Sequence, residues 1–376
     1  MSGKAIAVVG AYHTLLGRQV YDQSLEEMVF EAARGALADA NLTIEDIDSV
    51  ILSTTDQVEG RVIESMVTNG AAGGVGRDVT TLASAGEHAF IYGYLRLLAG
   101  QGRRVLAVVW SKESESLDPA HADILGAEPF LLRPLGMTSS AAAGLQASAY
   151  AALYGLDAAA VRTVRGTRGR AAELAYGLMV EKQKEAVSPI VAWPLTVADL
   201  PRSCDVAAAV VMVLGEEIAS GQSPAWIKGV GWSMDRYDLG ERDLSQFLAL
   251  REATRMALGT EGSPSDLDVI EAQEISSVAS FATFEALGLA PLGEGSAVLA
   301  DQHGPVLNPS GGNLPANPGN ASGFLRFFNA VQQVRGKAGN AQVGPRPKSA
   351  LGAGMHGFAG QGAAVMIFTA DRSEVV

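Results

Sequence analysis

Residues 31–37 read EAARGAL and residues 252–258 read EATRMAL, so both stretches follow the pattern Glu-Ala-x-Arg-x-Ala-Leu. Each stretch is followed by Asp-x-Asp, at residues 46–48 and 266–268, and then by a short apolar run. The two copies are about 220 residues apart along the chain. An amphipathic helix followed by a buried strand is typical of an α/β protein, and its return at one offset indicates a duplicated α/β unit. The alternative is that two α/β units share a common pattern by chance.

Other segments extend the repeat. Each half opens with a strand-like segment, at residues 5–10 and 225–231. Later in each half, a turn of small residues precedes a strongly apolar helix. These turns are Ala83-Ser84-Ala85-Gly86 and Asn320-Ala321-Ser322-Gly323. We therefore predict two halves, residues 1–222 and 223–376, whose apolar helices pack against each other, with strands buried on both faces.

Length and composition agree with a folded protein of two packed halves. The chain has 376 residues, whereas single cores stop growing near ~250 to 300. Charged residues make up 18%, against a usual ~25%, which excludes a disordered chain. The formal charge of -13 argues against nucleic acid or an anionic membrane as the main partner. No signal peptide or membrane span is evident, so we expect a cytoplasmic protein.

The cysteine and histidine content limits the possible chemistry. Cys204 is the only cysteine, which excludes a disulfide within the chain and any Cys-rich metal site. The five histidines are scattered and show no ligand spacing. We therefore expect no metal site.

A segment of the first half, roughly residues 111–200, has no counterpart in the second half. Loops of this length inside a compact domain are usually functional. The segment carries a cluster of arginines in an otherwise acidic chain, namely Arg162, Arg165, Arg168 and Arg170. The cluster is either a solvated helix face or a phosphate clamp, since guanidinium groups bind phosphate oxygens bidentately. In the second interpretation Arg165, Arg168 and Arg170 contact the phosphates of a ligand.

Five stretches together resemble a known family. They are the segment from Val79 through the first small-residue turn to Lys112, residues 194–211, the turn 271–274 (EAQE), the series 308–323 with NPSGG and NPG, and the loop 355–362. In order and content they are similar to the motifs of the thiolase superfamily, and most similar to its lipid-transfer-type and archaeal-type branch. The resemblance covers essentially the whole chain. It implies a duplicated α/β fold with five layers, α/β/α/β/α.

The same resemblance shows where the chain departs from the family. Thiolases use a cysteine at the N-terminus of a buried helix to attack an acyl thioester, assisted by a histidine and a second acid/base group. The matching positions here hold Ala83 for the cysteine, and Asn317 and Gln273 for two histidines. Alanine cannot form an acyl-enzyme, so we do not expect ordinary thiolase activity. Cys204 matches a structural position and is interpreted as a small buried residue.

Polar residues remain at several matching positions, and each allows two interpretations. His356 stands where the second catalytic cysteine usually lies, and it acts as an acid/base or only bonds to the backbone. Glu274 is the carboxylate partner of its turn or a loop charge. Asn317 keeps an amide that can hold a thioester carbonyl. Gly311 and Gly312 belong to a tight turn and form, in the functional interpretation, part of a ligand cradle.

Ser84 is the alternative nucleophile, one position after Ala83. A serine needs a base within hydrogen-bond reach to become nucleophilic. His88 follows at the start of the apolar helix and is interpreted as a core residue.

Two classes of function follow. In the first, the chain handles a coenzyme A (CoA) thioester in carbon–carbon bond chemistry without the Claisen cysteine, as an enzyme of the acyltransferase class within a heteromeric complex. Retro-aldol cleavage and acyl transfer to a serine are variants of this class. In the second, the chain is a non-catalytic subunit that binds thioesters or acts as a scaffold. CoA enters as part of the substrate, and no covalently bound cofactor is expected.

The resemblance also implies partners. We expect a homodimer formed through the edge strand and apolar helix of the first half. The run LAVVW at residues 106–110 is interpreted as that edge because it is too apolar to remain bare. A thiolase paralogue with an intact cysteine, or a small zinc-ribbon and OB-fold protein, is the expected second subunit.

Overall fold

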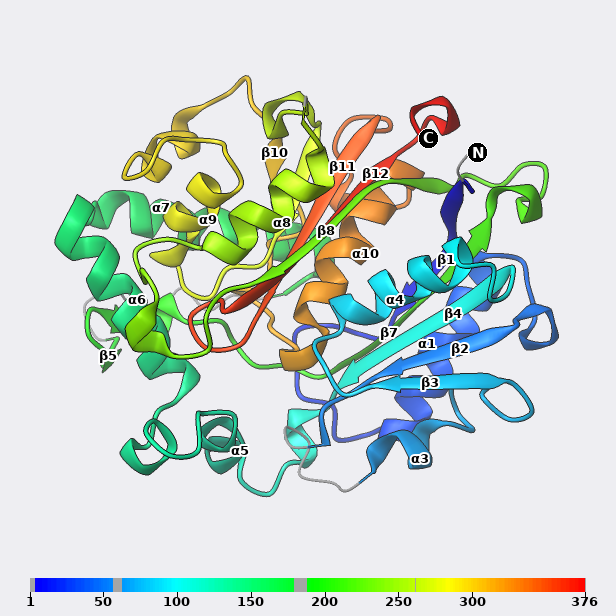
Figure 1. Ribbon diagram of the computed structural model, residues 1–376, viewed down its shortest axis with the longest axis horizontal. Helices are drawn as coiled ribbons and strands as arrows, with labels where there is room; N and C mark the ends of the chain where they lie inside the picture. The colour runs from blue at the N-terminus through cyan, green and yellow to red at the C-terminus, as the bar shows by residue number, and fades with distance from the viewer. Residues whose placement is uncertain (1–3, 57–62, 179–187, 261, 376) are drawn as a thin grey trace.

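The computed structural model describes residues 4–56, 63–178, 188–260 and 262–375. Strands form one large mixed sheet in the order β10-β9-β11-β12-β8-β1-β7-β4-β2-β3 (Figure 1). Their bounds are β1 Ile6–His13, β2 Ser49–Ser53, β3 Asp78–Leu82, β4 Arg104–Ser111, β7 Val206–Leu214, β8 Ala225–Met234, β9 Val269–Ala272, β10 Val306–Leu307, β11 Ser349–His356 and β12 Gly362–Thr369. A short hairpin, β5 (Ile190–Ala192) and β6 (Leu195–Thr196), stands apart from this sheet.

The strand order repeats between the two halves of the chain. From the outside inward, the first half runs β3-β2-β4-β7-β1 and the second runs β10-β9-β11-β12-β8. In both halves the outer three strands are parallel and the remaining contacts are antiparallel. The halves meet where β1 pairs with β8, through Ala7 with Trp226 and Val8 with Ala225. The repeated order is the structural form of the sequence repeat.

Helices complete a layered α/β structure. In the first half these are α1 Leu25–Asp39, α3 Glu64–Thr68 and α4 Glu87–Leu98, and in the second α8 Leu248–Leu258, α9 Ala279–Ala286 and α10 Ser322–Arg335. Helices α4 and α10 lie side by side at the centre (Figure 1), where the ring of Phe90 lies 5.2 Å from that of Phe324 and 5.5 Å from that of Phe327. Helix α1 covers the outer face of the first half and α8 that of the second. The fold is the duplicated five-layered arrangement predicted from the sequence.

The sheet is buried on both faces, as the apolar runs predict. Along β7, every second residue from Val206 to Leu214 packs toward the central helices. The intervening residues, from Ala207 to Val213, pack against α1 instead. Because side chains alternate along a strand, a continuous apolar run is the pattern of a strand with two buried faces.

Close helix–sheet packing explains part of the repeat. A Cβ on Gly10 of β1 would lie 2.2 Å from the carbonyl oxygen of Ala36 in α1. A Cβ on Gly229 of β8 would lie 2.0 Å from the carbonyl oxygen of Ala257 in α8. Ala36 and Ala257 occupy the same position of the repeated pattern. Both halves therefore use a glycine on the strand to let the helix backbone approach.

The unmatched segment of the first half forms α5 (Pro119–Leu125), α6 (Ser139–Tyr154) and α7 (Ala158–Tyr176). Apolar residues of α6 and α7, including Ala147 and Val164, join the core that lies over the outer face of the second half. In Figure 1, α6 and α7 lie on the left of the molecule beside α9, and α5 lies below them. The insertion therefore belongs to the first half in sequence but packs over the second half in the structure.

The interpretation of residues 106–110 as an edge is wrong. They belong to β4, which pairs with β2 on one side and β7 on the other, so their apolar character reflects the middle of the sheet. The edge of the first half is β3, which pairs with β2. Its residues are exposed or half-buried, and sequence DVTTL carries a charge and two threonines.

Candidate active site

A cavity of about 770 Å³ lies where the ends of several elements meet. The turn before α4, the loop after β11, the turn after β9 and the loop before α10 all contribute to its wall, together with α5 and the start of α6. The carboxyl ends of parallel strands are the usual place for a ligand site in α/β proteins. The polar residues that line the cavity include Ser84, Glu87, Glu113, Gln273, Asn317 and His356.

His356 ends β11 and is held by a buried carboxylate. Its Nδ1 lies 2.9 Å from Oε1 of Glu87, which begins α4 and is 1% exposed. A Cβ on Gly323 would lie 2.2 Å from Glu87 Oε2, and one on Gly362 would lie 2.0 Å from His356 Nε2. Glycines thus make room for both side chains. The pair joins the first half of the chain to the second.

The charge state of this pair follows from its contacts. Burial acts to raise the pKa of Glu87, but the hydrogen bond from His356 and its charge outweigh burial and hold the pKa below its usual value. An ionised Glu87 only accepts, so Nδ1 of His356 carries the proton. Nε2 is then the nitrogen that can exchange a proton with a ligand.

Ser84 has the base that a nucleophilic serine requires. Its Oγ lies 2.8 Å from Nδ1 of His88, the second residue of α4. The ring of His88 packs edge-on against the ring of His356, with 4.7 Å between centroids. Burial lowers the pKa of His88, Glu87 acts to raise it, and His356 lowers it further, so the net shift favours a neutral ring. His88 is half-buried and packs beside the cavity, which corrects its interpretation as a core residue.

Asn317 and Gln273 both line the cavity with fixed side chains. Oδ1 of Asn317 accepts hydrogen bonds from Asn313 Nδ2, at 3.2 Å, and from Ser322 Oγ. Its amide nitrogen is therefore the group oriented to donate to a ligand. Gln273 accepts a hydrogen bond of 3.0 Å from the backbone N–H of Met355 and so braces the strand before His356.

Glu113 is a further cavity residue that the sequence did not single out. It begins the short 3₁₀ turn after β4 and accepts a hydrogen bond of 2.5 Å from Ser203 Oγ. Burial raises the pKa of its carboxyl, Ser203 opposes that effect, and the nearby Asp205 adds to it. A carboxyl group held in this way is suited to proton transfer.

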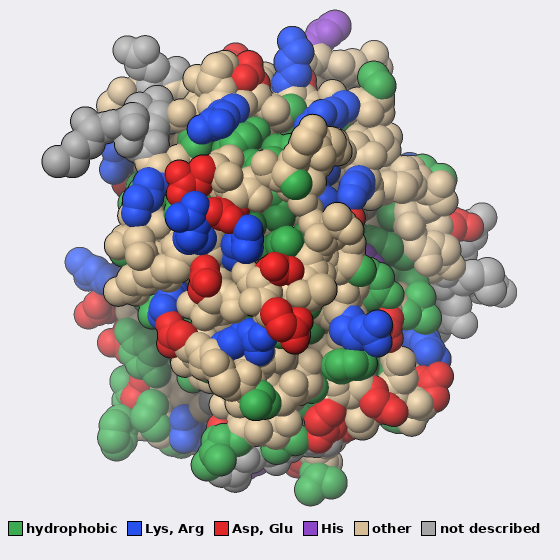
Figure 2. All heavy atoms as spheres, turned by 90° about the vertical axis from the view of Figure 1, so that its right-hand side faces the viewer, with side chains coloured by type: hydrophobic (Ala, Val, Ile, Leu, Met, Phe, Trp, Pro, Cys, Tyr) green, Lys and Arg blue, Asp and Glu red, His purple; other side chains and the backbone are tan. Residues whose placement is uncertain are grey.

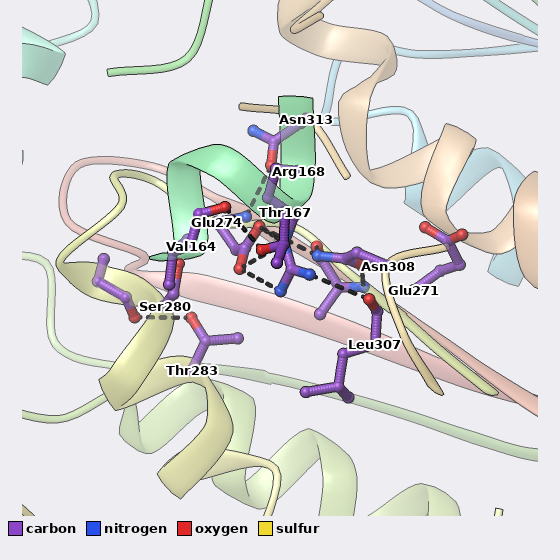
Figure 3. A network of polar contacts seen from close by, with 12 residues as sticks. Val164, Thr167, Arg168, Glu271, Glu274, Ser280, Thr283, Leu307, Asn308 and Asn313 are labelled. Carbon is purple, nitrogen blue, oxygen red and sulfur yellow. Dashed lines mark hydrogen bonds and ion pairs between the residues drawn. The ribbon is translucent and has the colours of Figure 1, made fainter. Parts of the chain in front are cut away.

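Glu274 and Arg168 lie outside the cavity, in a separate buried network (Figure 3). Arg168 comes from α7, and its Nη2 lies 2.9 Å from Oε1 of Glu274 while its Nη1 donates to the carbonyl of Leu307 at 3.0 Å. Asn308 Nδ2 donates to Oε2 of Glu274 at 3.0 Å. The backbone N–H of Glu274 donates to Oδ1 of Asn313 at 2.8 Å. Both charged side chains are therefore part of the scaffold that holds residues 308–317.

The remaining predicted phosphate ligands lie in different surroundings. Arg165 is half-buried, with Nη1 3.5 Å from Oδ1 of Asp199, whereas Arg170 is exposed. Gly311 and Gly312 have φ of +94° and +66°, and a Cβ on Gly311 would lie 2.7 Å from that of Ala172 in α7. The two glycines thus let the loop pack on α7 and turn toward Asn317.

Neither Ala83, which matches the family's cysteine, nor the thiol of Cys204 offers an accessible nucleophile. Ala83 is exposed and is not among the residues that line the cavity, whereas Ser84 and Ala85 are. Cys204 is 1% exposed, and burial raises the pKa of its thiol to about 12. A thiol in this state is unreactive.

Metal and membrane features are absent from the parts of the chain that the structure describes. Among these residues, no group of three or more His, Cys, Asp or Glu side chains is placed to hold a metal ion. Within the same residues, no helix is long and apolar enough to cross a bilayer. Figure 2 shows a face on which Lys and Arg side chains are intermixed with Asp and Glu.

Comparison with known proteins agrees with the architecture. Residues 231–370 match the family model described as thiolase C-terminal domain-like. An acetyl-CoA acetyltransferase of Methanothermobacter thermautotrophicus is 25% identical over 356 residues, which cover 90% of this chain and 93% of the relative. Sterol carrier protein 2 of Rattus norvegicus is 39% identical over 123 residues, which cover 31% of this chain and 22% of that protein. The solved structure "Ltp2-ChsH2(DUF35) aldolase" superimposes with a TM-score of 0.79 at 19% identity, covering 98% of this chain and 99% of that one.

The C-terminal part of the chain thus matches the thiolase C-terminal domain-like family, and the whole chain has the fold of the solved thiolase-like structures. The chain also shares its fold with a solved sterol-carrier-protein-2-thiolase-like protein of Mycobacterium smegmatis, which superimposes with a TM-score of 0.67 at 17% identity and covers 100% of this chain and 79% of that one.

Proposed function

We propose that this chain binds an acyl-CoA thioester in the cavity beside His356 and makes or breaks a carbon–carbon bond next to the thioester, without a cysteine acyl-enzyme. The observation that carries the proposal is the hydrogen bond of 2.9 Å between His356 and the buried Glu87, at a cavity that Asn317 also lines. A volume of about 770 Å³ is within the ~300 to 1,000 Å³ of typical ligand pockets. CoA is part of the substrate in this proposal.

The groups present suit retro-aldol cleavage of a 3-hydroxyacyl thioester. Nε2 of His356 takes the hydroxyl proton, the bond between the second and third carbons breaks, and an aldehyde or ketone leaves. The amide of Asn317 donates to the enolate oxygen that develops on the thioester. His356 then returns the proton to the second carbon, which yields the shortened acyl thioester. Glu87 stabilises the imidazolium formed between these steps.

A catalytic role within a complex accounts for a second set of observations. Large apolar side chains are exposed on the insertion beside the cavity, namely Leu117, Phe130, Leu131 and Leu135. Exposed apolar clusters commonly mark protein interfaces. A zinc-ribbon and OB-fold protein or a thiolase paralogue with an intact cysteine is the partner we propose, in a cytoplasmic complex. One solved relative is itself described as a complex with a DUF35 protein.

A non-catalytic subunit is the competing function. Ala83 at the family's nucleophile position and the exposed apolar insertion favour it. In that case the cavity binds a thioester, and the chemistry belongs to a second protein.

Binding and cleavage assays separate the two functions. Calorimetry with acetyl-CoA tests binding, and cleavage of 3-hydroxy-3-phenylpropanoyl-CoA to benzaldehyde and acetyl-CoA tests catalysis by ultraviolet absorbance. We expect His356→Gln to lower the cleavage rate by about 10²- to 10⁴-fold with little change in affinity. The exposed His303 provides the control variant His303→Gln. Binding without cleavage, alone and with the co-purifying partner, would assign the chain to the non-catalytic class.

A further inference from the structure

The turn before α4 carries a second reactive arrangement beside the His356–Glu87 pair. Ser84 lines the cavity, and its Oγ lies 2.8 Å from Nδ1 of His88. A hydroxyl and an imidazole at this distance are the minimal requirement for nucleophilic catalysis by serine. The retro-aldol reaction described above uses neither residue.

We propose that Ser84 and His88 form a nucleophile–base pair that accepts the acyl group of a bound CoA thioester and releases the free thiol. The inference rests on the thioester binding of the proposed function, but it assigns a different reaction to the same cavity. The substrate class is an acyl-CoA, and the products after hydrolysis are a carboxylate and CoA.

The reaction balances without any redox partner. Oγ of Ser84 attacks the thioester carbonyl while its proton passes to Nδ1 of His88. The carbon–sulfur bond then breaks, and His88 returns the proton to the departing thiolate. Water completes the cycle, because it attacks the acyl-serine ester, gives its proton to His88 and regenerates the Ser84 hydroxyl.

The surroundings of His88 agree with a role as base. A neutral imidazole accepts at Nδ1 only when its proton is on Nε2. Glu87 and His356 are the titratable groups that pack against this ring, and they are already engaged with each other through Nδ1 of His356. Burial lowers the pKa of His88, and together with His356 it outweighs the opposing effect of Glu87, so the ring is kept neutral. Nδ1 of His88 stays available to Ser84.

Two further features favour attack at this position. Ser84 stands at the N-terminal end of α4, a helix of 12 residues, where the helix dipole favours developing negative charge. Asn317 lines the same cavity with its amide nitrogen oriented as a donor. The tetrahedral oxyanion thus has a donor and a favourable field.

Intact-protein mass spectrometry after exposure to acetyl-CoA tests the pair, together with the rate of thiol release. The full-length parent and the control Ser265→Ala, which removes an exposed hydroxyl far along the chain, should acquire an acetyl group that maps to Ser84. Ser84→Ala should acquire none. His88→Gln should acylate about 10²- to 10³-fold more slowly, which is the usual contribution of a general base. Ser84→Cys should regain acylation, because it keeps a nucleophile within reach of His88.

Each contrary outcome has a distinct meaning. Calorimetric binding of acetyl-CoA without an adduct or thiol release would overturn the inference and leave the proposed function standing. An adduct that maps to another residue, or an unchanged rate in folded His88→Gln, would reduce the Ser84–His88 contact to a local hydrogen bond. Absence of binding by the parent protein would reject both the proposed function and the inference.

Discussion

Nη2 of Arg168 lies 2.9 Å from Oε1 of Glu274, and both side chains are buried although they are 106 residues apart in the chain. Arg168 belongs to the insertion of the first half, and Glu274 follows β9 of the second. Their contact fixes α7 over the loop that presents Asn317. The insertion is therefore part of the wall of the site as well as a cover for the second half.

Removing one partner of this pair should be costly. Arg168→Ala leaves the carboxylate of Glu274 buried and without its cation, a change that typically costs about 3 to 5 kcal/mol. Arg170→Ala removes an exposed arginine from the same helix and should cost less than about 1 kcal/mol. Urea unfolding of both variants measures the difference. Equal losses would mean that the buried contact adds nothing to stability.

Coenzyme A affinity should depend on Arg165 and Arg170, two of the three arginines of α7 that lie outside the core. Arg165 pairs with Asp199, which directly precedes the cavity residue Leu200, and Arg170 is exposed one turn further along. Arg165→Ala with Arg170→Ala should weaken CoA binding about ten- to hundredfold, the effect of losing charge-assisted contacts of about 1.5 to 3 kcal/mol. Arg255→Ala on α8 is the control. If calorimetry gives the same CoA affinity for the double variant and the parent, Arg165 and Arg170 belong to a solvated helix face and do not bind phosphate.

Glu87 should make stability depend on pH in a defined direction. Its pKa in the folded state lies below the usual 4.5, because the bond from His356 outweighs the effect of burial. The ionised form is thus favoured by folding, and its contribution is complete above about pH 4.5 and lost as the pH falls through the lower folded value. The stability difference between the parent and Glu87→Gln should shrink between pH 7 and pH 3. Urea unfolding across this range checks it, and a difference that is constant with pH would contradict the assignment.

A thiol at the family's nucleophile position should not restore thiolase activity. Ala83 is exposed and does not line the cavity, and Asn317 and Gln273 stand where proton-transferring histidines are needed. Neither the parent nor Ala83→Cys should cleave acetoacetyl-CoA with CoA at a useful rate, because such sites act as a unit. Loss of acetoacetyl-CoA absorbance is the measurement. Steady turnover by Ala83→Cys would show that His356 supplies more acid-base catalysis than we assign to it.

Association should occur through β3, since this strand is the edge of the first half. Light scattering should give a species of twice the 39.0 kDa chain at micromolar concentration. Thr81→Lys, which places a charge on the exposed side of the edge, should shift the protein toward monomer. The control Met256→Lys, at an exposed position of α8, should leave the oligomeric state unchanged. A monomeric parent protein would remove the basis for this interface.

The sequence predicted the layers well because their cause is local and repeated. The pattern at Ala36 and Ala257 recurs since each helix crosses a strand glycine, Gly10 or Gly229, and the apolar runs mark strands with two buried faces. The order of strands in the sheet was harder to predict. An apolar run such as residues 106–110 fits either an edge strand covered by a second subunit or a strand in the middle of the sheet. The pairing of β4 with both β2 and β7 shows that it is the second.

The site was predictable only in part. His356, Asn317 and Ser84 were found because they stand at positions of a resembling motif series, and all three line the cavity. Glu87 and Glu113 were missed, since a glutamate at a helix start or after a strand is ordinarily a surface residue. The adjacent letters Glu87-His88 after the small-residue turn were the available signal. Glu274 was predicted as the carboxylate partner of its turn from the resemblance, and its burial against Arg168, 106 residues away, could not be inferred from the sequence.

The position of the insertion also sets an order for folding during synthesis. Helix α7 is complete about a hundred residues before Glu274 leaves the ribosome, so the side of α7 that carries Arg168 has no partner at that stage. Contacts between segments this distant close slowly and late. An isolated first half should therefore expose an apolar and cationic helix face, a natural target for chaperones, until the second half emerges and covers it.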